Sequence, residues 1–394
     1  MPQSPSPRVV SAPKDLIGAW IDADPAFAAS MRRLLRHAPS SDIPATSDLV
    51  SSEDLEQYLV RLGEGSLSLV AVGDIMVGGR AKRLIRHHGA EYPFRATEPL
   101  LRRAAIVLGN LEGPLARIAR REPRNHSYRL GPDVGFALKR IGIHVLTLAN
   151  NHLLDCGRAG VLETLDALAQ AGIDVVGAGV DERAAHVPVV RQAGDWRVGL
   201  LGYYWNRRCA ATRRLPGSAM DPFAALEADI GALRQRVDRV VVTFHWGIPY
   251  EREPSAEDRA KARFAVDCGA DVVVGHHPHV IQPFEIHRGR PIFYSIGNFA
   301  FGSGNSRAEG LALGVRFEPE RTTVDVYPLY VKNRDPRVAY QPKALRGEAA
   351  ARVLLRVVEI SGASGKALHV DGPRGRLVLP SPNGDRGGRT GTDA

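Results

Sequence analysis

The chain contains the stretch Val272-Val273-Val274-Gly275-His276-His277-Pro278-His279, in which a β-branched apolar run ends in three histidines. A short apolar run closed by glycine is typical of a buried strand that is followed by a loop. In a His-x-His segment such as 277–279, both imidazoles lie on one side of an extended backbone. Such a pair alone is as typical of structural histidines as of metal ligands, so its meaning depends on the other strand ends.

Four further apolar runs end in residues that can bind a metal. They are 68–72 before Asp74, 105–108 before Asn110 and Glu112, 144–148 before Asn150, Asn151 and His152, and 240–244 before His245. Because ligands of α/β proteins bind at the carboxyl ends of strands, the five ends predict one edge where these side chains converge. Mixed oxygen and nitrogen ligands favour Mn, Fe, Zn or Co over Ca or an iron–sulfur centre. Two such ions about 3.5–4 Å apart are suited to phosphoester hydrolysis.

Strands and helices alternate along the chain, which predicts an α/β fold of sheets covered by helices. Helices are expected over 80–87, 97–103, 133–140, 158–171, 221–236 and 256–268. We expect one further strand over 291–299 and a hairpin of 311–317 with 322–330.

Four regions are expected. Residues 1–66 form an N-terminal helical extension, partly disordered, with helices around 25–37 and 52–62, and 67–335 form the main domain. Residues 336–380 form an appendage with a helix over 348–360 and a hairpin over 367–379. Residues 381–394 are expected to be disordered, because they offer little apolar surface to offset the entropy of ordering.

The composition limits the classes of function. The 394 residues are 44% hydrophobic, enough to fill a core, and the formal net charge is +9. Because the arginines are scattered rather than gathered in one run with aromatic residues, we expect an anionic small-molecule or polymer substrate and no nucleic acid.

The sequence also bears on the expected location of the protein. It contains no apolar run of about 18 residues, so no membrane span is expected. The first seven residues lack the pattern of a signal peptide, so a cytoplasmic location is the expectation. Three widely spaced cysteines, Cys156, Cys209 and Cys268, argue against a disulfide framework.

Six spaced motifs over about 68–330 resemble the CapA-type family of poly-γ-glutamate capsule synthesis proteins. The motifs are Gly73-Asp74-Ile75-Met76, Asn110-Leu111-Glu112, Ala149-Asn150-Asn151-His152 with Asp155-x-Gly157, His245-Trp246-Gly247, His277-Pro278-His279-Val280-x-Gln282 and Tyr294-Ser295-Ile296-Gly297-Asn298-Phe299. The resemblance implies the calcineurin-like metallophosphoesterase fold, a four-layer α/β/β/α sandwich of two facing mixed sheets. It also implies a site for two divalent transition-metal ions.

The resemblance assigns the metal ligands residue by residue. The implied ligands are Asp74, Glu112, Asn151, His245, His277 and His279. Two positions depart from the wider superfamily pattern. Met76 stands where the Asp-x-His motif has its histidine, and Glu112 replaces the bridging aspartate. One ion therefore loses an imidazole, so weaker coordination or a single bound ion is left open.

Other residues are expected to act beside the metals. In the wider fold the histidine matching His152 lies beside the leaving group, so we expect it to be a general acid or oxyanion stabiliser. Arg80, one turn into a helix after the Asp74 loop, can pair with an anionic substrate or face solvent. The Asn-His pair can also serve only to shape a turn. Supporting roles are expected for His276, Asn298 and Asn110.

Three functions remain open. The first is a metal-dependent hydrolase that acts on a phosphoester or a related anionic bond, with His152, Asp74 and Arg80 as catalytic residues. The second, implied by the family, is making, transferring or cleaving γ-glutamyl amide bonds. The third is a non-catalytic binding module. Specificity is expected in loops 117–131 and 203–220, which are rich in arginine and aromatic residues.

Overall fold

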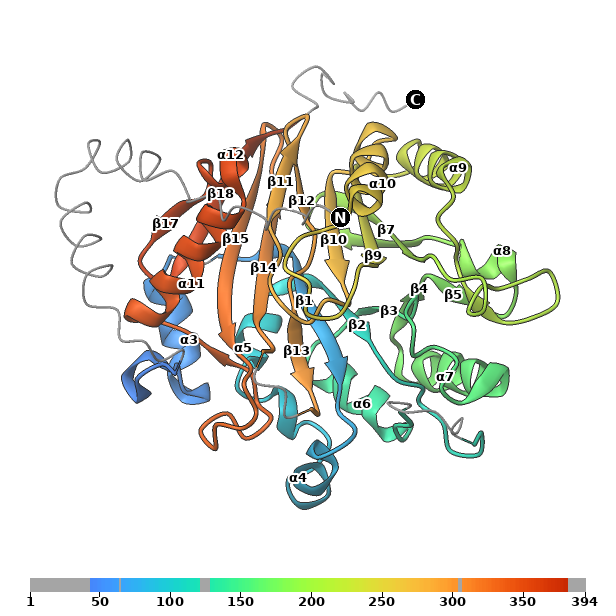
Figure 1. The fold of residues 1–394 in the computed structure, drawn as a ribbon, viewed down its shortest axis with the longest axis horizontal. Coiled ribbons are helices and arrows are strands. Elements are labelled where there is room, and N and C mark those ends of the chain that lie inside the picture. Colours follow the sequence, from blue (N-terminus) through green and yellow to red (C-terminus); the bar gives the residue numbers. More distant parts are fainter. Residues whose placement is uncertain (1–42, 64, 121–127, 304–306, 382–394) are drawn as a thin grey trace, which may run out of the picture. The chain divides into compact units, whose positions relative to one another are not determined.

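Two mixed β-sheets form the centre of this computed structural model, which describes residues 43–63, 65–120, 128–303 and 307–381 (Figure 1). The large sheet has the order β17 (His369–Asp371), β18 (Arg374–Pro380), β15 (Arg321–Tyr330), β14 (Gly310–Phe317), β1 (Leu67–Met76), β2 (Ala104–Leu111), β3 (Val145–Thr147), β4 (Asp174–Val176). Strands β1 to β4 are parallel, so their carboxyl ends lie at one edge.

The second sheet has six strands. Their order is β11 (Phe284–His287), β12 (Arg290–Phe293), β10 (Val272–His276), β9 (Arg239–His245), β7 (Trp196–Tyr204), β6 (Val189–Ala193). Strands β7, β9, β10 and β12 are parallel. A separate small sheet pairs β5 (Ala178–Gly179) with β8 (Gly217–Ser218).

Side chains alternate between two cores along the strands, because successive residues of a strand point to opposite faces. Leu69 of β1 packs in one apolar cluster with Val272 and Val274 of β10. The next residue, Val70, packs in a second cluster on the other face of the large sheet. Because the first cluster contains residues of both sheets, the two sheets face each other across a shared core.

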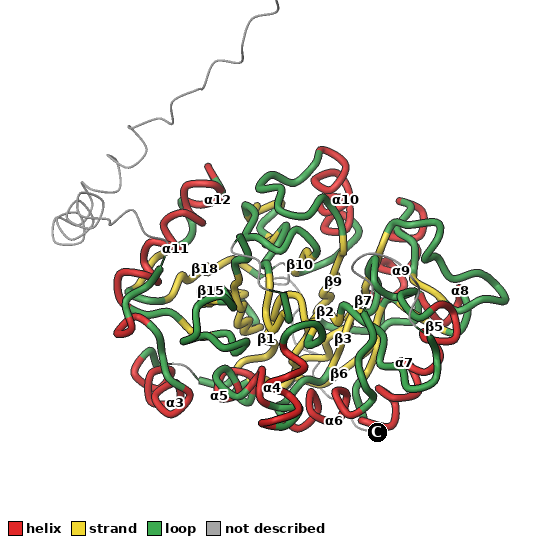
Figure 2. The backbone as a smooth tube through the Cα atoms, turned by 60° about the horizontal axis from the view of Figure 1, so that its bottom comes forward, coloured by secondary structure: helices red, strands yellow, loops and turns green. Residues whose placement is uncertain are grey.

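Helices cover the outer faces of both sheets, and Figure 2 shows them at the periphery with the strands between them. The large sheet is covered by α3 (Ser52–Arg61), α5 (Glu98–Leu101), α6 (Asp133–Arg140) and α7 (Gly157–Ala171). The six-stranded sheet is covered by α9 (Phe223–Arg234) and α10 (Ala256–Asp267). The remaining helical elements are η1 (Thr46–Asp48), α4 (Ala81–His88), η2 (Tyr92–Phe94), α8 (Glu182–Ala185), α11 (Gly347–Ile360) and α12 (Gly362–Gly365). The expected four-layer α/β/β/α sandwich of two facing mixed sheets is confirmed.

The segments on both sides of the expected main domain pack onto it where they are described. Leu55 and Leu59 of α3 share a core cluster with Val70 of β1. Tyr58 of the same helix donates its hydroxyl hydrogen to the carbonyl of Leu345, 3.1 Å away. Strand β18 pairs with β15, and α11 packs against both. The helix expected over 25–37 and the tail from 382 onward lie outside the described residues.

The single strand expected over 291–299 is wrong. Strand β12 ends at Phe293 and pairs within the six-stranded sheet, whereas β13 (Asn298–Phe301) pairs with β1 of the large sheet. The chain passes from one sheet to the other at Gly297. The φ of Gly297 is +69°, which favours glycine, and a Cβ at this position would lie 2.1 Å from the carbonyl oxygen of Glu309. The change places Asn298 opposite Asp74 in the β1–β13 register. Strand β16 (Lys343–Ala344) adds a short pairing to β15.

Among the described helices, none combines the length and the apolar character that a membrane crossing requires.

Candidate metal centre

Asp74 lies at the carboxyl end of β1, where the pairing register with β2 shifts after Ala71. Its side chain is fully buried, and its Oδ1 accepts a hydrogen bond of 2.8 Å from Nδ2 of Asn110. The same Asn110 nitrogen also donates to Oε1 of Glu112 at 3.0 Å. One amide of β2 therefore holds two buried carboxylates near each other.

The orientation of the Asn110 amide is itself fixed. Nδ2 of Asn150, in the loop after β3, donates to Oδ1 of Asn110 at 3.0 Å and to the carbonyl of Leu111 at 2.8 Å. Because the Asn110 oxygen is taken by this donor, its NH2 group is the part that faces Asp74 and Glu112. Glu112 keeps one carboxylate oxygen, the buried Oε2, without a hydrogen-bond partner.

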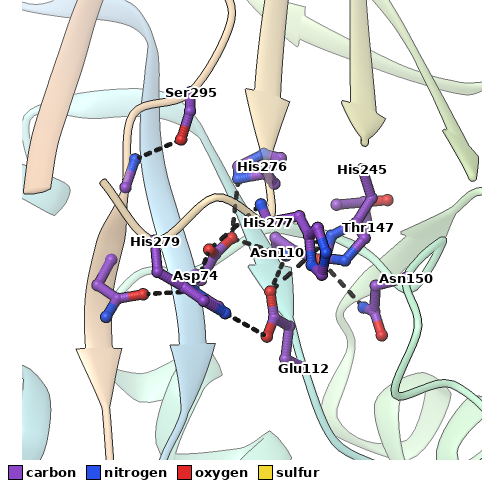
Figure 3. A network of polar contacts seen from close by, with 12 residues as sticks. Asp74, Asn110, Glu112, Thr147, Asn150, His245, His276, His277, His279 and Ser295 are labelled. Carbon is purple, nitrogen blue, oxygen red and sulfur yellow. Dashed lines mark hydrogen bonds and ion pairs between the residues drawn. The ribbon is translucent and has the colours of Figure 1, made fainter. Parts of the chain in front are cut away.

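The loop after β10 brings His279 to these carboxylates, and Figure 3 shows the three side chains directed toward one another. Nδ1 of His279 lies 2.9 Å from Oδ2 of Asp74, and its Nε2 lies 3.9 Å from Oε2 of Glu112. One potential ligand atom from each of Asp74, Glu112 and His279 lies within 4.8 Å of the other two. His277 and His279 both have positive φ, 99° and 57°, so the backbone between them is turned rather than extended.

A second group of possible ligands adjoins Glu112. Nδ1 of His245, the last residue of β9, lies 3.8 Å from Oε1 of Glu112. Its Nε2 lies 3.0 Å from Oδ1 of Asn151, and its ring centroid lies 4.5 Å from that of His277. All six ligands that the resemblance implies are thus brought together, with Glu112 between the two groups.

His152 lies beside the centre rather than within it. Its Nδ1 is 2.8 Å from Oδ2 of Asp155, which also accepts a hydrogen bond of 2.6 Å from the backbone nitrogen of Tyr128. The Tyr128 ring lies 4.7 Å from the imidazole, centroid to centroid. Because Asp155 bonds Nδ1, Nε2 is the ring nitrogen that remains for another contact.

His276 and Asn298 each contact one residue of the Asp74, Glu112 and His279 group. His276 is fully buried at the end of β10, and its Nδ1 lies 3.3 Å from Oδ1 of Asp74. His279 donates its Nδ1 hydrogen to Oδ1 of Asn298 at 2.9 Å. Ser295, in contrast, bonds the carbonyl of Val280 and so supports the backbone of the His279 loop.

Different neighbours move the pKa values of the two buried carboxyl groups in opposite directions. Burial alone would raise the pKa of Asp74, but the hydrogen bonds and charges of His276 and His279 outweigh it and hold that pKa well below its usual range. Burial, followed by the nearby Asp74 carboxylate, raises the pKa of Glu112 well above its usual range.

Burial also lowers the pKa of two imidazoles. It brings the pKa of His277 to about 4, with a further contribution from the charge of His279, and it lowers the pKa of His245 well below the usual value. Both rings are therefore neutral near pH 7, which is the protonation state that binds a metal.

The residues present fit a divalent cation. Within the described residues, Asp74 and Glu112 form ion pairs with histidines but with no lysine or arginine. Buried carboxylates need a compensating positive charge, and carboxylate, amide and imidazole groups together suit a transition-metal ion. Met76 supplies no such ligand, because its buried sulfur accepts the Gly78 backbone N–H at 3.2 Å.

Arg80 forms no hydrogen bond or ion pair with the residues of the centre among the described residues. It precedes α4 as its N-cap instead of lying one turn inside the helix, so the expected position in the helix is wrong. Its side chain is exposed, and among the described residues this side chain makes no hydrogen bond or ion pair. The helix begins at Ala81, one residue later than expected, because the exact start of a helix is only loosely set by its sequence pattern.

Two polar residues of the site had no assigned role in the sequence. Asp155 stands three residues after His152, a spacing that could have indicated a side-chain contact within one turn. Asn150 joins Asn110 to the backbone nitrogen of His152, which donates to its Oδ1 at 3.1 Å. In the expected specificity loop 203–220, Tyr203 is instead buried and bonds Asp229. Residues 121–127 of the other loop lie outside the described residues.

The fold and the site together define a class: an α/β/β/α sandwich protein with a buried carboxylate–imidazole centre of metal-binding type at the carboxyl ends of its strands. Residues 68–303 match the family model described as "Bacterial capsule synthesis protein PGA_cap". The chain belongs to this family, and the resemblance noted from the motifs is confirmed.

Two relatives and one solved structure illustrate the similarity. The chain is 35% identical to "Capsule biosynthesis protein CapA" of Bacillus anthracis over 283 residues, 69% of each chain. It is 34% identical to "PGA biosynthesis protein CapA" of Bacillus subtilis (strain 168) over 253 residues, 63% of this chain and 66% of the relative. A 5'-nucleotidase precursor from Thermus thermophilus matches with a TM-score of 0.40 and 14% identity, over 80% of this chain and 54% of that chain.

Proposed function

We propose that the protein is a metal-dependent hydrolase in which a water molecule attacks a phosphoester or a related anionic bond. The observation that carries the proposal is the buried group Asp74, Glu112 and His279, whose possible ligand atoms lie within 4.8 Å of one another. Two carboxylates without a lysine or arginine partner are costly to bury. A bound cation removes that cost, so the arrangement is better explained by a metal centre than by stability.

We expect two divalent ions of Mn, Fe, Zn or Co. Asp74, Glu112 and His279 would hold one ion, and Glu112, Asn151, His245 and His277 would hold the other. Such ions lower the pKa of coordinated water and stabilise the charge that develops on the attacked group. The first ion has no imidazole from position 76, so its binding is expected to be the weaker of the two.

The other side chains are assigned to substrate and proton transfer. His152 is the proposed general acid, because Asp155 holds its Nδ1 and leaves Nε2 to protonate the leaving oxygen. Asn298 and His276 are proposed to position His279 and Asp74 rather than to react. Arg80 remains a proposed contact for an anionic group of the substrate.

A second candidate is cleavage or transfer at a γ-glutamyl amide bond. Family membership favours it, since the similar proteins carry names that refer to capsule or PGA biosynthesis. The same residues can stabilise a tetrahedral centre at carbon as well as a displacement at phosphorus. An anionic polymer would then be the substrate.

Measurement of bound metal, together with assays on a panel of substrates, tests these candidates. The purified protein and its Asp74→Asn and His277→Ala variants would be assayed for bound transition metal and for hydrolysis of phosphomonoesters, phosphodiesters and γ-glutamyl peptides. Asp48→Asn is a matched control, because Asp48 lies in η1, outside the centre. We expect both site variants to lose metal and activity and the control to keep them. Full metal loading without turnover of any substrate would instead support a binding module.

A further inference from the structure

Glu309, which directly precedes β14, bonds two segments of the candidate metal centre at once. Its backbone N–H donates to the carbonyl of His279 at 3.2 Å, and its own carbonyl accepts from the backbone nitrogen of Asn298 at 2.7 Å. Its side-chain Oε2 accepts a third hydrogen bond, of 3.1 Å, from the backbone nitrogen of Ile281. A single residue therefore joins the His279 loop to the start of β13, from which Asn298 bonds the His279 imidazole.

The backbone that Glu309 holds has an uncommon conformation. His277 and His279 have φ values of 99° and 57°, a region that residues other than glycine rarely adopt. Such a conformation persists only where the surrounding structure determines it. Glu309 bonds the carbonyl of His279 and the nitrogen of Ile281, so it holds the chain at the turn itself and again two residues later.

Two arginines hold the Glu309 carboxylate in turn. Its Oε1 lies 3.1 Å from Nη2 of Arg252, in the loop after β9, and 2.8 Å from Nη1 of Arg356 on α11. The other terminal nitrogen of Arg252 donates to Oε2 at 3.3 Å. The carboxylate side chain is only 12% exposed, so these ion pairs are less screened by solvent than pairs at the surface. Because both oxygens are bonded, Glu309 is placed to orient the loop rather than to bind a metal.

The packing of α11 fixes the position of Arg356. Leu354 of this helix shares a core cluster with Leu377 of β18, in the large sheet. Ser361, which follows the helix, accepts a hydrogen bond of 3.0 Å at its hydroxyl from the backbone nitrogen of Phe284 in β11, in the six-stranded sheet. Helix α11 is thereby attached to both sheets, and Arg356 lies between the two attachments along the helix.

We propose that Glu309 is a positioning residue of the candidate metal centre, where it fixes the backbone at His279 and thereby the direction of the imidazole. Arg252 and Arg356 act through Glu309 by holding its carboxylate. This role rests on the proposed function, because the imidazole that it positions is a proposed metal ligand. Glu309 and Arg356 both lie beyond residues 68–303, which match the family model, so the support comes from outside the matched part of the chain.

Glu285 offers a matched comparison, because it is a similar carboxylate that does not bond the His279 loop. Its side chain is 17% exposed, and it accepts hydrogen bonds from Nε of Arg263 at 2.7 Å and from the hydroxyl of Tyr294 at 2.8 Å. Among the described residues, no hydrogen bond joins this side chain to residues 277–281. If Glu309 served stability alone, its loss and the loss of Glu285 should have the same consequences for the centre.

The first measurement is amide hydrogen exchange in the metal-free protein. Glu309→Ala is expected to speed exchange of the Ile281 amide by roughly tenfold, because that N–H loses its acceptor. The His277 amide, which bonds Asp74 and not Glu309, should also exchange faster, because the loop as a whole is released. Glu285→Ala should leave both amides unchanged, and urea denaturation measures the stability that each variant loses.

The second measurement is a titration with Co²⁺, followed by its visible absorption. Glu309→Ala is expected to bind Co²⁺ roughly tenfold more weakly, and Glu285→Ala to bind it like the unaltered protein. Arg356→Gln is a milder change that keeps Glu309 in place, so a loss of roughly two- to fivefold is expected. Arg356→Lys keeps the positive charge and should restore most of the affinity.

The outcomes separate this role from the proposed function. Faster exchange at Ile281 without any change at His277, or equal Co²⁺ affinity in Glu309→Ala and Glu285→Ala, would overturn the positioning role. If the unaltered protein binds no Co²⁺, the proposed function fails. In that case, faster exchange of both amides in Glu309→Ala alone still supports the positioning of the loop, and equal exchange in the two variants overturns it.

Discussion

Asn298 accepts a hydrogen bond from His279, with 2.9 Å between its Oδ1 and the imidazole Nδ1. The two residues come from different segments, because Asn298 begins β13 while His279 lies in the loop after β10. The bond turns the imidazole so that Nε2 faces Glu112, 3.9 Å from its Oε2. A residue that fixes a metal-binding histidine in this way contributes to metal affinity without touching the ion.

The first prediction concerns this bond. Asn298→Ala is expected to weaken metal binding by roughly ten- to a hundredfold, the usual cost of losing a partner of a metal-binding histidine. Asn298→Asp keeps an acceptor oxygen and should retain most of the affinity. Competition with a chromogenic chelator measures both. Gln170→Ala is the control, since among the described residues the Gln170 side chain bonds only the exposed Asp166 on α7. Similar affinity of Asn298→Ala and the control would show that the bond has no role in binding.

The second prediction concerns the turn that places Asn298. Gly297 has a φ of +69°, and a Cβ there would lie 2.1 Å from the Glu309 carbonyl oxygen, so the backbone must move to accept a side chain. Gly297→Ala is expected to lower the free energy of unfolding by more than ~2 kcal/mol and to weaken metal binding. Gly63→Ala is a matched control with a φ of +67° and no atom within 4 Å of the added Cβ.

Gly63→Ala should therefore cost only the backbone strain, about 1 kcal/mol, which urea denaturation of the metal-free proteins can resolve. If the two variants lose equal stability, the close approach to Glu309 is not what requires glycine.

The change of sheets at Gly297 also marks what the sequence could not reveal. The segment 291–299 is rich in β-branched and aromatic residues, and local propensity predicts one strand. Its division between two sheets is decided by tertiary packing, because Phe293 pairs with β10 while Asn298 pairs with β1. The five strand ends were predictable, in contrast, because parallel strands necessarily bring their carboxyl ends to one edge. The position of Arg80 was missed for a local reason, since helix starts vary by a residue or more.

The third prediction is a pH dependence of stability in the metal-free protein. Burial, aided by His279, lowers the pKa of His277 to about 4 in the folded protein, whereas an unfolded histidine has a pKa near 6.5. Between these values the unfolded chain binds a proton that the folded chain does not. Stability is therefore expected to fall as pH falls from about 6.5 to 4, by roughly 2 kcal/mol between pH 7 and pH 5.

Urea denaturation at pH 7 and pH 5 measures this loss. His277→Gln removes the titrating group, so its loss of stability between the two pH values should be smaller by about that amount. If His277→Gln loses as much stability between pH 7 and pH 5 as the unaltered protein does, groups other than His277 cause the loss.

The last prediction separates a general acid from a merely structural histidine. Asp155 holds His152 by a bond of 2.8 Å, and it holds the Tyr128 backbone nitrogen as well. If His152 protonates the leaving oxygen, His152→Ala should lower kcat by about a hundredfold or more for an alkyl phosphoester. A p-nitrophenyl ester needs no such proton because its leaving group is a weak base, so the loss there should be several times smaller. Asp155→Asn should follow the same pattern to a lesser degree, since a positioning residue acts through His152. Equal losses on both esters would mean that His152 supports the loop or binds substrate, and the leaving group would then have to obtain its proton from solvent.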